Sequence, residues 1–353
     1  MKTIRTTCPY CGVGCGVLAS VDDAGQVSVR GDDQHPANLG RLCVKGAALG
    51  ETTGLAGRLL APEVDGQQVA WPQALAETAA RLQQVIDQHG PQAVAFYASG
   101  QLLTEDYYAA NKLMKGFIGA ANIDTNSRLC MSSAVTGYKR AFGADVVPCS
   151  YEDVENSDLV VLVGSNAAWA HPVLFQRLAQ AKRDNPRLRI VVIDPRRTAT
   201  CEIADRHLAL APGSDGGLFV GLLNAVAQAG ACIDGFRDGS QALAEARGWD
   251  VAKVADFCGL TVDEVSAFYR EFIAAPRAIT LYTMGINQSA SGSDKCNAII
   301  NVHLASGKYG RRGCGPFSLT GQPNAMGGRE VGGLATMLAA HMDFVPDDLQ
   351  RLA

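Results

Sequence analysis

The sequence predicts an α/β protein with a doubly wound parallel sheet, preceded by a small cysteine-rich segment. Two continuous apolar runs, residues 158–164 and 189–194, have the composition of parallel strands that are buried on both faces. A helix is expected between them over residues 173–182, and strand–helix alternation of this kind is typical of doubly wound sheets. Three cysteines within residues 8–15 set the N-terminal segment apart from the rest of the chain.

The remaining elements are predicted from periodicity and turn residues. Residues 26–30 predict a short hairpin strand with a turn over residues 22–25. A helix is expected to begin near Pro72 and to end at Gly90, because apolar residues recur between them at helical spacing. The other expected elements are strands over residues 93–98 and 278–283 and helices over residues 104–117, 217–228, 263–273 and 297–305.

Length, composition and charge limit the class of protein. The chain has 353 residues, which corresponds to two or three domains at ~150 residues each. Its 31 Lys+Arg and 35 Asp+Glu give a net charge of −4, and a hydrophobic content of 47% excludes a disordered chain. No cluster of Lys and Arg predicts a nucleic-acid partner, and no apolar run approaches the ~18 residues of a membrane span.

Eleven cysteines are the unusual feature of the composition. An odd number in a chain of this size does not predict a disulfide framework. The residues before Cys8 contain no apolar signal region, no twin-arginine pair and no cleavage site. We therefore expect a cytoplasmic protein with no membrane partner, whose thiols stay reduced.

Four of the cysteines predict a metal centre. Cys8, Cys11 and Cys15 share one glycine-rich loop, and Cys43 follows far along the chain. Thiolates at such spacing select zinc or an iron–sulfur cluster, and this three-plus-one pattern suits a cluster held by four cysteines. The alternatives are a zinc site with His35 as a ligand and four unrelated buried cysteines.

Several loops that follow expected strands predict a ligand at one edge of the sheet. Small residues there permit close approach of a phosphate, and an Asp can accept from ribose hydroxyls or a guanine N–H pair. Several such loops in one sheet indicate a long nucleotide-like cofactor, although a glycine at one strand end is usually only a turn. Neither a GxGxxG fingerprint nor a Walker loop is present. The loops are residues 164–166, 171–172, 194–198, 211–217 and 284–288.

Taken together, the motifs resemble those of a known family. They are the CxxCxxxC…CxKG pattern from Cys8 to Gly46 and residues 126–134, 164–166, 194–197 and 321–332. Over essentially its whole length the sequence resembles the molybdopterin-guanine-dinucleotide oxidoreductases of the dimethyl-sulfoxide-reductase superfamily, and most closely their bacterial assimilatory nitrate-reductase branch. The resemblance implies a small iron–sulfur domain followed by doubly wound α/β domains of the molybdopterin oxidoreductase type.

The resemblance also implies roles for individual residues. Cys8, Cys11, Cys15 and Cys43 would hold a 4Fe-4S cluster, and Cys130 would ligate the molybdenum of a bis(molybdopterin guanine dinucleotide) cofactor. Lys45 matches a lysine between cluster and pterin, on the electron path. Gln322 and Arg329 match residues at the active-site end of the substrate funnel. The positions that match cofactor contacts are Lys45, Asn166, Asp194, Arg196, Asp215, Gly285, Gln288 and Gln322.

Each of these residues also has an ordinary structural interpretation. Apart from the resemblance, Lys45 would be a solvated loop lysine and Cys130 a buried core cysteine. Arg329 could form a salt bridge with a nearby acid such as Glu330.

Met131 distinguishes the subclasses of the family. Formate dehydrogenases of this superfamily have a histidine directly after the metal-binding residue, and a methionine cannot accept a proton. Met131 together with Arg329 is similar to the nitrate reductases, so the resemblance implies reduction of nitrate to nitrite by oxygen-atom transfer. The alternatives are a formate dehydrogenase-like enzyme, another oxyanion reductase, and a non-catalytic cluster-bearing electron-transfer subunit.

Members of this family are more than twice as long as this chain, so we expect it to be an N-terminal portion. The expected layout is a cluster domain over residues 1–57, the first part of a second α/β domain over 58–140, a pterin-binding domain over 141–315, and a truncated return to the second domain over 316–353. The sequence leaves open whether such a portion retains the molybdenum cofactor. The electron donor implied is an NADH-linked flavoprotein, a ferredoxin or a flavodoxin.

Overall fold

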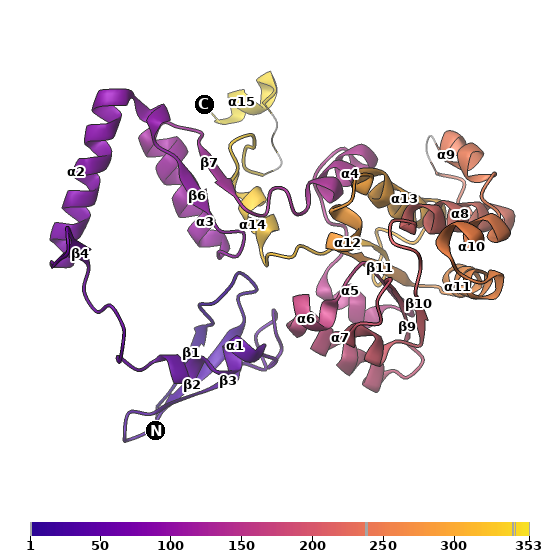
Figure 1. Ribbon diagram of the computed structural model, residues 1–353, viewed down its shortest axis with the longest axis horizontal. Coiled ribbons are helices and arrows are strands. Elements are labelled where there is room, and N and C mark those ends of the chain that lie inside the picture. Colours follow the sequence, from indigo (N-terminus) through magenta and orange to yellow (C-terminus); the bar gives the residue numbers. More distant parts are fainter. Residues whose placement is uncertain (1, 237–238, 341, 343, 353) are drawn as a thin grey trace. The chain divides into compact units, whose positions relative to one another are not determined.

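The computed structural model describes residues 2–236, 239–340, 342 and 344–352. The chain forms two compact units (Figure 1). Unit 1 comprises Met1–Arg128 and Gln322–Ala353, and unit 2 comprises Leu129–Gly321. Unit 2 is therefore continuous in sequence, whereas both ends of the chain build unit 1. The four-part division expected from the resemblance stays a prediction.

Unit 2 is built on a five-stranded parallel sheet with the order β10-β9-β8-β11-β12. Numbered along the chain, these strands lie in the order 3-2-1-4-5, so the sheet is doubly wound and the predicted fold class is confirmed. The strands are β8 (Leu159–Val163), β9 (Arg189–Ile193), β10 (Arg206–Leu208), β11 (Ala278–Tyr282) and β12 (Gly315–Ser318).

Helices cover both faces of this sheet. Side chains alternate along β8, so Val161 packs into the core on one face and Val160 and Leu162 into the core on the other. The first face is covered by α4 (Ser132–Phe142), α8 (Asp215–Gln228), α10 (Val251–Cys258), α11 (Val262–Ala274) and α13 (Gly292–Ala305). The second is covered by α5 (Tyr151–Asn156), α6 (Ala167–Ala170) and α7 (Pro172–Asp184) (Figure 1). The remaining elements of unit 2 are η4 (Ala199–Ile203), α9 (Gly239–Ala246) and α12 (Met284–Asn287).

Unit 1 combines three small sheets with helices. Its strands are β1 (Lys2–Thr7), β2 (Gly16–Val21), β3 (Val27–Gly31), β4 (Glu63–Val64), β5 (Gln67–Gln68), β6 (Phe96–Ala98) and β7 (Ile123–Thr125). Its helices are α1 (Val44–Ala47), η1 (Leu49–Thr52), α2 (Trp71–His89), η2 (Pro91–Ala93), α3 (Thr104–Asn111), the π-helix η3 (Lys112–Ile118), α14 (Ala325–Glu330) and α15 (Pro346–Leu352). Among the described residues, no helix combines the length and apolarity that a membrane span requires.

Most expected elements are present, with differences that have physical causes. The predicted hairpin turn forms, with Asp22 Oδ1 accepting from the Ala24 and Gln26 N–H groups. The helix expected at residue 297 begins at Gly292, because its first turn buries the charged Lys295 and so lacks an apolar pattern. The helix expected over residues 104–117 continues as a π-helix from Lys112. Strand β1 was not predicted, since all six of its residues are exposed and give no alternation.

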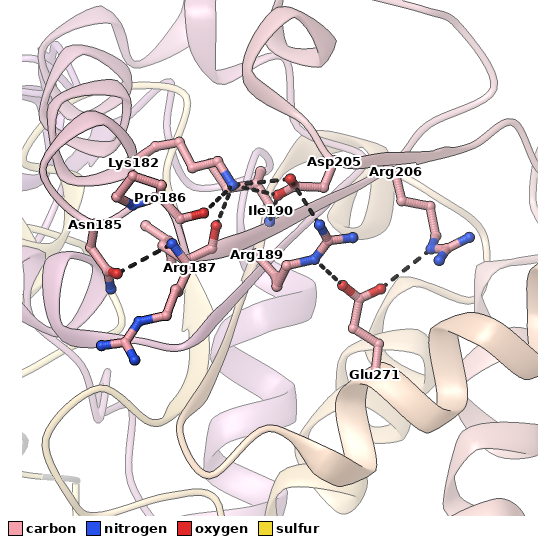
Figure 2. Close-up of polar contacts among 10 residues, drawn as sticks. Lys182, Asn185, Pro186, Arg187, Arg189, Ile190, Asp205, Arg206 and Glu271 are labelled. Carbon is pink, nitrogen blue, oxygen red and sulfur yellow. Dashed lines mark hydrogen bonds and ion pairs between the residues drawn. The ribbon is translucent and has the colours of Figure 1, made fainter.

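A charged network ties together the amino-terminal end of the unit 2 sheet (Figure 2). Asp205 accepts from Lys182 Nζ at 2.9 Å, from Arg189 Nη1 at 3.0 Å and from the Ile190 N–H at 2.8 Å. Glu271 on α11 accepts from Arg189 Nε at 2.7 Å and from Arg206 Nε at 3.3 Å. The Asp205 side chain is 17% exposed, so these contacts are better shielded than surface ion pairs.

We expect Asp205→Ala to lower the free energy of unfolding by about 2–3 kcal/mol, because it leaves Lys182 and the Ile190 N–H without their carboxylate. Urea unfolding of the purified protein measures this. Asp184→Ala is the matched control, since Asp184 is exposed and accepts from Gln180 Nε2, and it should cost less than about 0.5 kcal/mol. Equal losses in the two variants would contradict the assignment.

His303 on α13 is a buried neutral histidine. Its Nδ1 contacts the Lys308 carbonyl and its Nε2 contacts Thr280 Oγ1, both at 2.8 Å. A carbonyl can only accept, so Nδ1 carries the proton and Nε2 accepts from the hydroxyl. Burial lowers the pKa of His303 to about 4.

The buried His303 predicts a stability loss in mild acid. Its pKa lies below the ordinary value of 6.5. The unfolded chain therefore binds the proton first, and stability falls as the pH drops from 6.5 towards 4, by on the order of 3 kcal/mol. His303→Gln should flatten this part of the curve of unfolding free energy against pH. An unchanged slope would show that His303 is not its source.

Candidate functional site

The cysteines predicted to hold a cluster lie on two short segments of unit 1. Cys8, Cys11 and Cys15 are on the loop between β1 and β2, and Cys43 is the N-cap residue of α1. The Cys8 N–H donates to the Cys15 carbonyl at 2.8 Å, which closes the loop. Gly14 has a φ of +64°, which glycine adopts without strain. These features fold the three-cysteine segment into a tight turn.

The pKa values of Cys8 and Cys15 are raised by burial and by the neighbouring cysteines of the predicted cluster. Burial first, and then the other three cysteines, raise the pKa of Cys15 to about 12. Burial also raises the pKa of Cys8, with smaller contributions from Cys11 and Cys43. Thiolates in such a site need compensating positive charge, and four soft sulfur donors suit iron. The residues therefore fit an iron–sulfur cluster.

The zinc alternative included His35 as a possible ligand. His35 Nδ1 accepts from the Ala37 N–H at 3.4 Å, and its ring packs on Gly16, where a Cβ would lie 2.4 Å from it. Over the ranges that the structure describes, no group of three or more His, Cys, Asp or Glu residues is placed to hold a single metal ion.

Lys45 is an exposed residue of α1. Its charge lowers the pKa of Cys8, although burial has the larger, opposite effect. Lys45 therefore lies within electrostatic range of the cluster thiols.

The carboxyl ends of β8 and β11 form the point at which the strand order of the unit 2 sheet reverses, where doubly wound folds bind their ligands. The Gly285 N–H donates to the Gly164 carbonyl at 3.1 Å, and Thr283 Oγ1 donates to the same carbonyl at 2.6 Å. A Cβ on Gly164 would lie 2.7 Å from Gly285 Cα. The two backbones are therefore in direct contact, with no side chain between them.

Predicted cofactor residues follow β8 and β9 at this edge. Asn166 Oδ1 accepts from Thr200 Oγ1 at 3.0 Å. Asp194 Oδ1 accepts from the Arg196 N–H at 2.9 Å, and the Arg196 side chain is exposed. The buried Ser165 hydroxyl has no hydrogen-bond partner within the described part of the chain. A buried polar atom without a partner at this edge fits a site that takes a polar ligand.

Asp215, also predicted to bind the cofactor, is paired with a residue that the sequence did not reveal. It is the first residue of α8, and its Oδ2 lies 2.9 Å from Lys295 Nζ on α13. Both side chains are less than 10% exposed. A lone lysine in a polar helical turn carries no sequence signal of this pairing.

Cys130 and Met131 are buried at the start of α4. Gln288 Nε2 donates to Cys130 Sγ at 3.6 Å, so two predicted site residues lie together. A Cβ on Gly321 would lie 3.5 Å from Cys130 Sγ and 3.0 Å from the Met284 sulfur. Met284, the first residue of α12, belongs to the strand-end loop over residues 284–288 that the sequence predicted to face a ligand, but it was not singled out as a site residue.

The other predicted active-site residues belong to unit 1. Gln322 packs beside Gly100, where a Cβ would lie 2.9 Å from the Gln322 Cβ. Arg329 is half-buried on α14. Its charge acts on Tyr107, whose pKa burial raises to about 12 and Arg329 lowers slightly. The predicted roles of all these residues stay predictions.

Comparisons with known proteins identify the family. Residues 1–53 match the molybdopterin oxidoreductase Fe4S4 domain, and residues 58–349 match the molybdopterin oxidoreductase family. The chain is 83% identical over 353 residues to a nitrate reductase of Klebsiella oxytoca, covering all of this chain and 41% of that protein. It is 38% identical to the periplasmic nitrate reductase of Desulfovibrio desulfuricans, over 96% of this chain and 48% of that protein.

The chain spans less than half the length of these relatives. Among solved structures, acetylene hydratase from Pelobacter acetylenicus shares the fold, with a TM-score of 0.72 and 21% identity over 86% of this chain and 43% of that one. The family matches support a 4Fe-4S cluster and a molybdopterin cofactor. The two family matches together cover nearly the whole chain, which therefore belongs to the molybdopterin oxidoreductases, a family of enzymes.

Proposed function

We propose that this chain forms the N-terminal part of a molybdenum-dependent nitrate reductase, which reduces nitrate to nitrite with electrons delivered through the 4Fe-4S cluster. The observation that carries the proposal is the 83% identity with a nitrate reductase along all 353 residues. The overall reaction consumes two electrons and two protons and releases nitrite and water.

The cofactor proposed is molybdenum bis(molybdopterin guanine dinucleotide). When bound, it supplies the oxygen-atom transfer chemistry. Cys130 would provide a thiolate ligand to the metal, and Gln288 donates a hydrogen bond to that sulfur. Gly285 is exposed, so its backbone is accessible to a phosphate, and the carboxylates of Asp194 and Asp215 could accept from ribose or guanine groups.

Side chains of this chain determine which substrate is favoured. Met131 has no titratable group, so it cannot take a proton from formate. Arg329 offers paired donors that match two oxygens of a planar anion such as nitrate. Lys45 would place a fixed positive charge beside the cluster thiols, which favours electron arrival there.

An assimilatory role in the cytoplasm is also part of the proposal. All eleven cysteines are free thiols, which suits a reducing compartment. An assimilatory nitrate reductase of Haloferax mediterranei is 38% identical over 99% of this chain and 49% of that protein. The donor would be an NADH-linked flavoprotein, a ferredoxin or a flavodoxin.

The test is nitrate reduction by the full-length protein with a reduced dye, alongside iron and molybdenum analysis. We expect nitrite formation and both metals. If the protein instead reduces the dye with formate and forms no nitrite from nitrate, the result would support a formate dehydrogenase-like enzyme. Iron without molybdenum in the full-length protein would support a cluster-bearing electron-transfer subunit.

We expect Cys130→Ala in the full-length protein to abolish nitrate reduction while the iron content stays the same, because the change removes a metal thiolate outside the cluster. Cys232→Ala is the control, since Cys232 is a partly buried thiol outside the site, and it should keep full activity. Undiminished activity of Cys130→Ala would refute the ligand assignment.

We expect Cys15→Ser to remove most of the iron and the visible absorption of the cluster, because a hydroxyl is a poor iron ligand. Cys201→Ser changes an equally buried thiol outside the loop and should retain the iron. Circular dichroism shows whether each variant is folded. A folded Cys15→Ser protein with its full iron content would contradict a four-cysteine cluster.

A further inference from the structure

Helix α14, which carries Arg329, lies along α3 and is fixed at its start. Asn324 precedes α14 and has a left-handed φ of +67°. Its Nδ2 donates to the Leu102 carbonyl and to Thr104 Oγ1, both at 3.0 Å. The amino end of α14 is therefore attached to the beginning of α3.

The middle of α14 packs directly on α3. Gly328 is buried, and a Cβ there would lie 2.9 Å from the Tyr107 ring. The next residue is Arg329, whose charge acts on Tyr107. The position of the Arg329 backbone is thus set by how closely α14 contacts α3.

The carboxyl end of α14 is fixed by two side chains from the end of α3 and from the π-helix η3. Asn111 Nδ2 donates to the Val331 carbonyl at 2.6 Å. Lys115 Nζ donates to the carbonyls of Gly332, Leu334 and Met337, at 2.6, 2.9 and 3.0 Å. Four carbonyls of one returning segment are therefore held by two side chains one helical turn apart.

The Lys115 ammonium is fully used by these contacts. It has three N–H donors, and three main-chain carbonyls accept from them. Burial lowers the pKa of Lys115, so the charged form is retained against a desolvation cost. A cation beside the carbonyls that follow α14 also complements the negative end of that helix. A π-helical turn such as η3 is often found at functional sites.

We propose that Lys115, assisted by Asn111, is a positioning residue that fixes α14 and thereby holds the Arg329 guanidinium in place to bind nitrate. This inference rests on the proposed function. Loss of the clamp, meaning the bonds of Lys115 and Asn111 to residues 331–337, weakens substrate binding without changing the metal centre. Nitrate affinity therefore depends on a lysine that does not itself contact the anion.

The first test is Lys115→Met in the full-length holoenzyme, which keeps the length of the side chain and removes the charge. We expect the KM for nitrate to rise about tenfold and kcat to stay within about twofold, because ground-state and transition-state binding are lost equally. Iron and molybdenum contents should not change. Hydrogen exchange of the amides of residues 331–337 should accelerate, which reports on the clamp independently of activity.

Lys112→Met is the matched control on the same π-helix. Lys112 is exposed and lies over the Tyr108 ring, 5.5 Å from its centroid. Its KM and exchange rates should equal those of the wild type. If Lys115→Met does not fold, Asn111→Ala replaces it as the test. This milder variant removes one hydrogen bond and should raise the KM about threefold. An unchanged KM in folded Asn111→Ala would then overturn the proposal.

A double-mutant cycle tests whether Lys115 acts through Arg329. In an Arg329→Ala background, Lys115→Met should cause no further rise in KM, because the group that it positions is gone. A full tenfold effect in that background would overturn the proposal. A parallel loss of kcat and molybdenum in Lys115→Met would also overturn it, because such a loss indicates general damage to the protein. Unchanged hydrogen exchange of residues 331–337 in that variant would overturn it as well.

The proposed function and this inference fail differently. A wild-type holoenzyme that does not reduce nitrate overturns the function, and with it the role in nitrate binding. A wild type that reduces nitrate, together with a Lys115→Met variant of unchanged KM, overturns the positioning role alone.

Discussion

The contact between Gly164 and Gly285 is the constraint on which the site in unit 2 depends. It joins the ends of β8 and β11 where the strand order reverses, and a Cβ on either glycine would lie within 2.7 Å of the other backbone. A side chain at either position would push the two loops apart. One loop carries Asn166 and the other carries Gln288, which donates to Cys130. The spacing of these predicted cofactor and metal residues therefore depends on the absence of two Cβ atoms.

The features that the sequence revealed are local ones. The apolar runs of β8 and β9 and the spacing of Cys8, Cys11 and Cys15 are visible within a few residues, and the structure contains the expected strands and loop. Cys130 and Arg329 needed the family resemblance, because a lone buried cysteine and a lone arginine have commoner structural roles. Partnerships between distant residues left no trace in the sequence. Lys115 and its carbonyl partners are 217 to 222 residues apart, and Lys295 and Asp215 are 80 apart.

Lys295 in unit 2 and Lys115 in unit 1 are stabilised by partners of different kinds. In unit 2, Lys295 is neutralised by a carboxylate, and the pair can stay ionised because each charge compensates the other. In unit 1, the partners of Lys115 are carbonyl dipoles, which solvate the charge without cancelling it. The positive charge of Lys115 therefore remains, close in space to the segment that follows Arg329. Such a charge favours anions electrostatically.

Because unit 2 is inserted into unit 1, the two units become complete at different times during synthesis. Residues 129–321 emerge as one continuous stretch, and the doubly wound sheet can form as soon as β12 has left the ribosome. Residues 2–128 must wait for residues 322–340, and translation of the insertion takes on the order of tens of seconds. During that interval Tyr107 and Lys115 lack the segment over residues 322–340 that packs on them. Residues 2–128 therefore depend on their own sheets, helices and bound cluster to avoid misfolding. The four cysteines within the first forty-three residues can therefore begin to acquire iron before the later segment of unit 1, which includes Arg329, has been made.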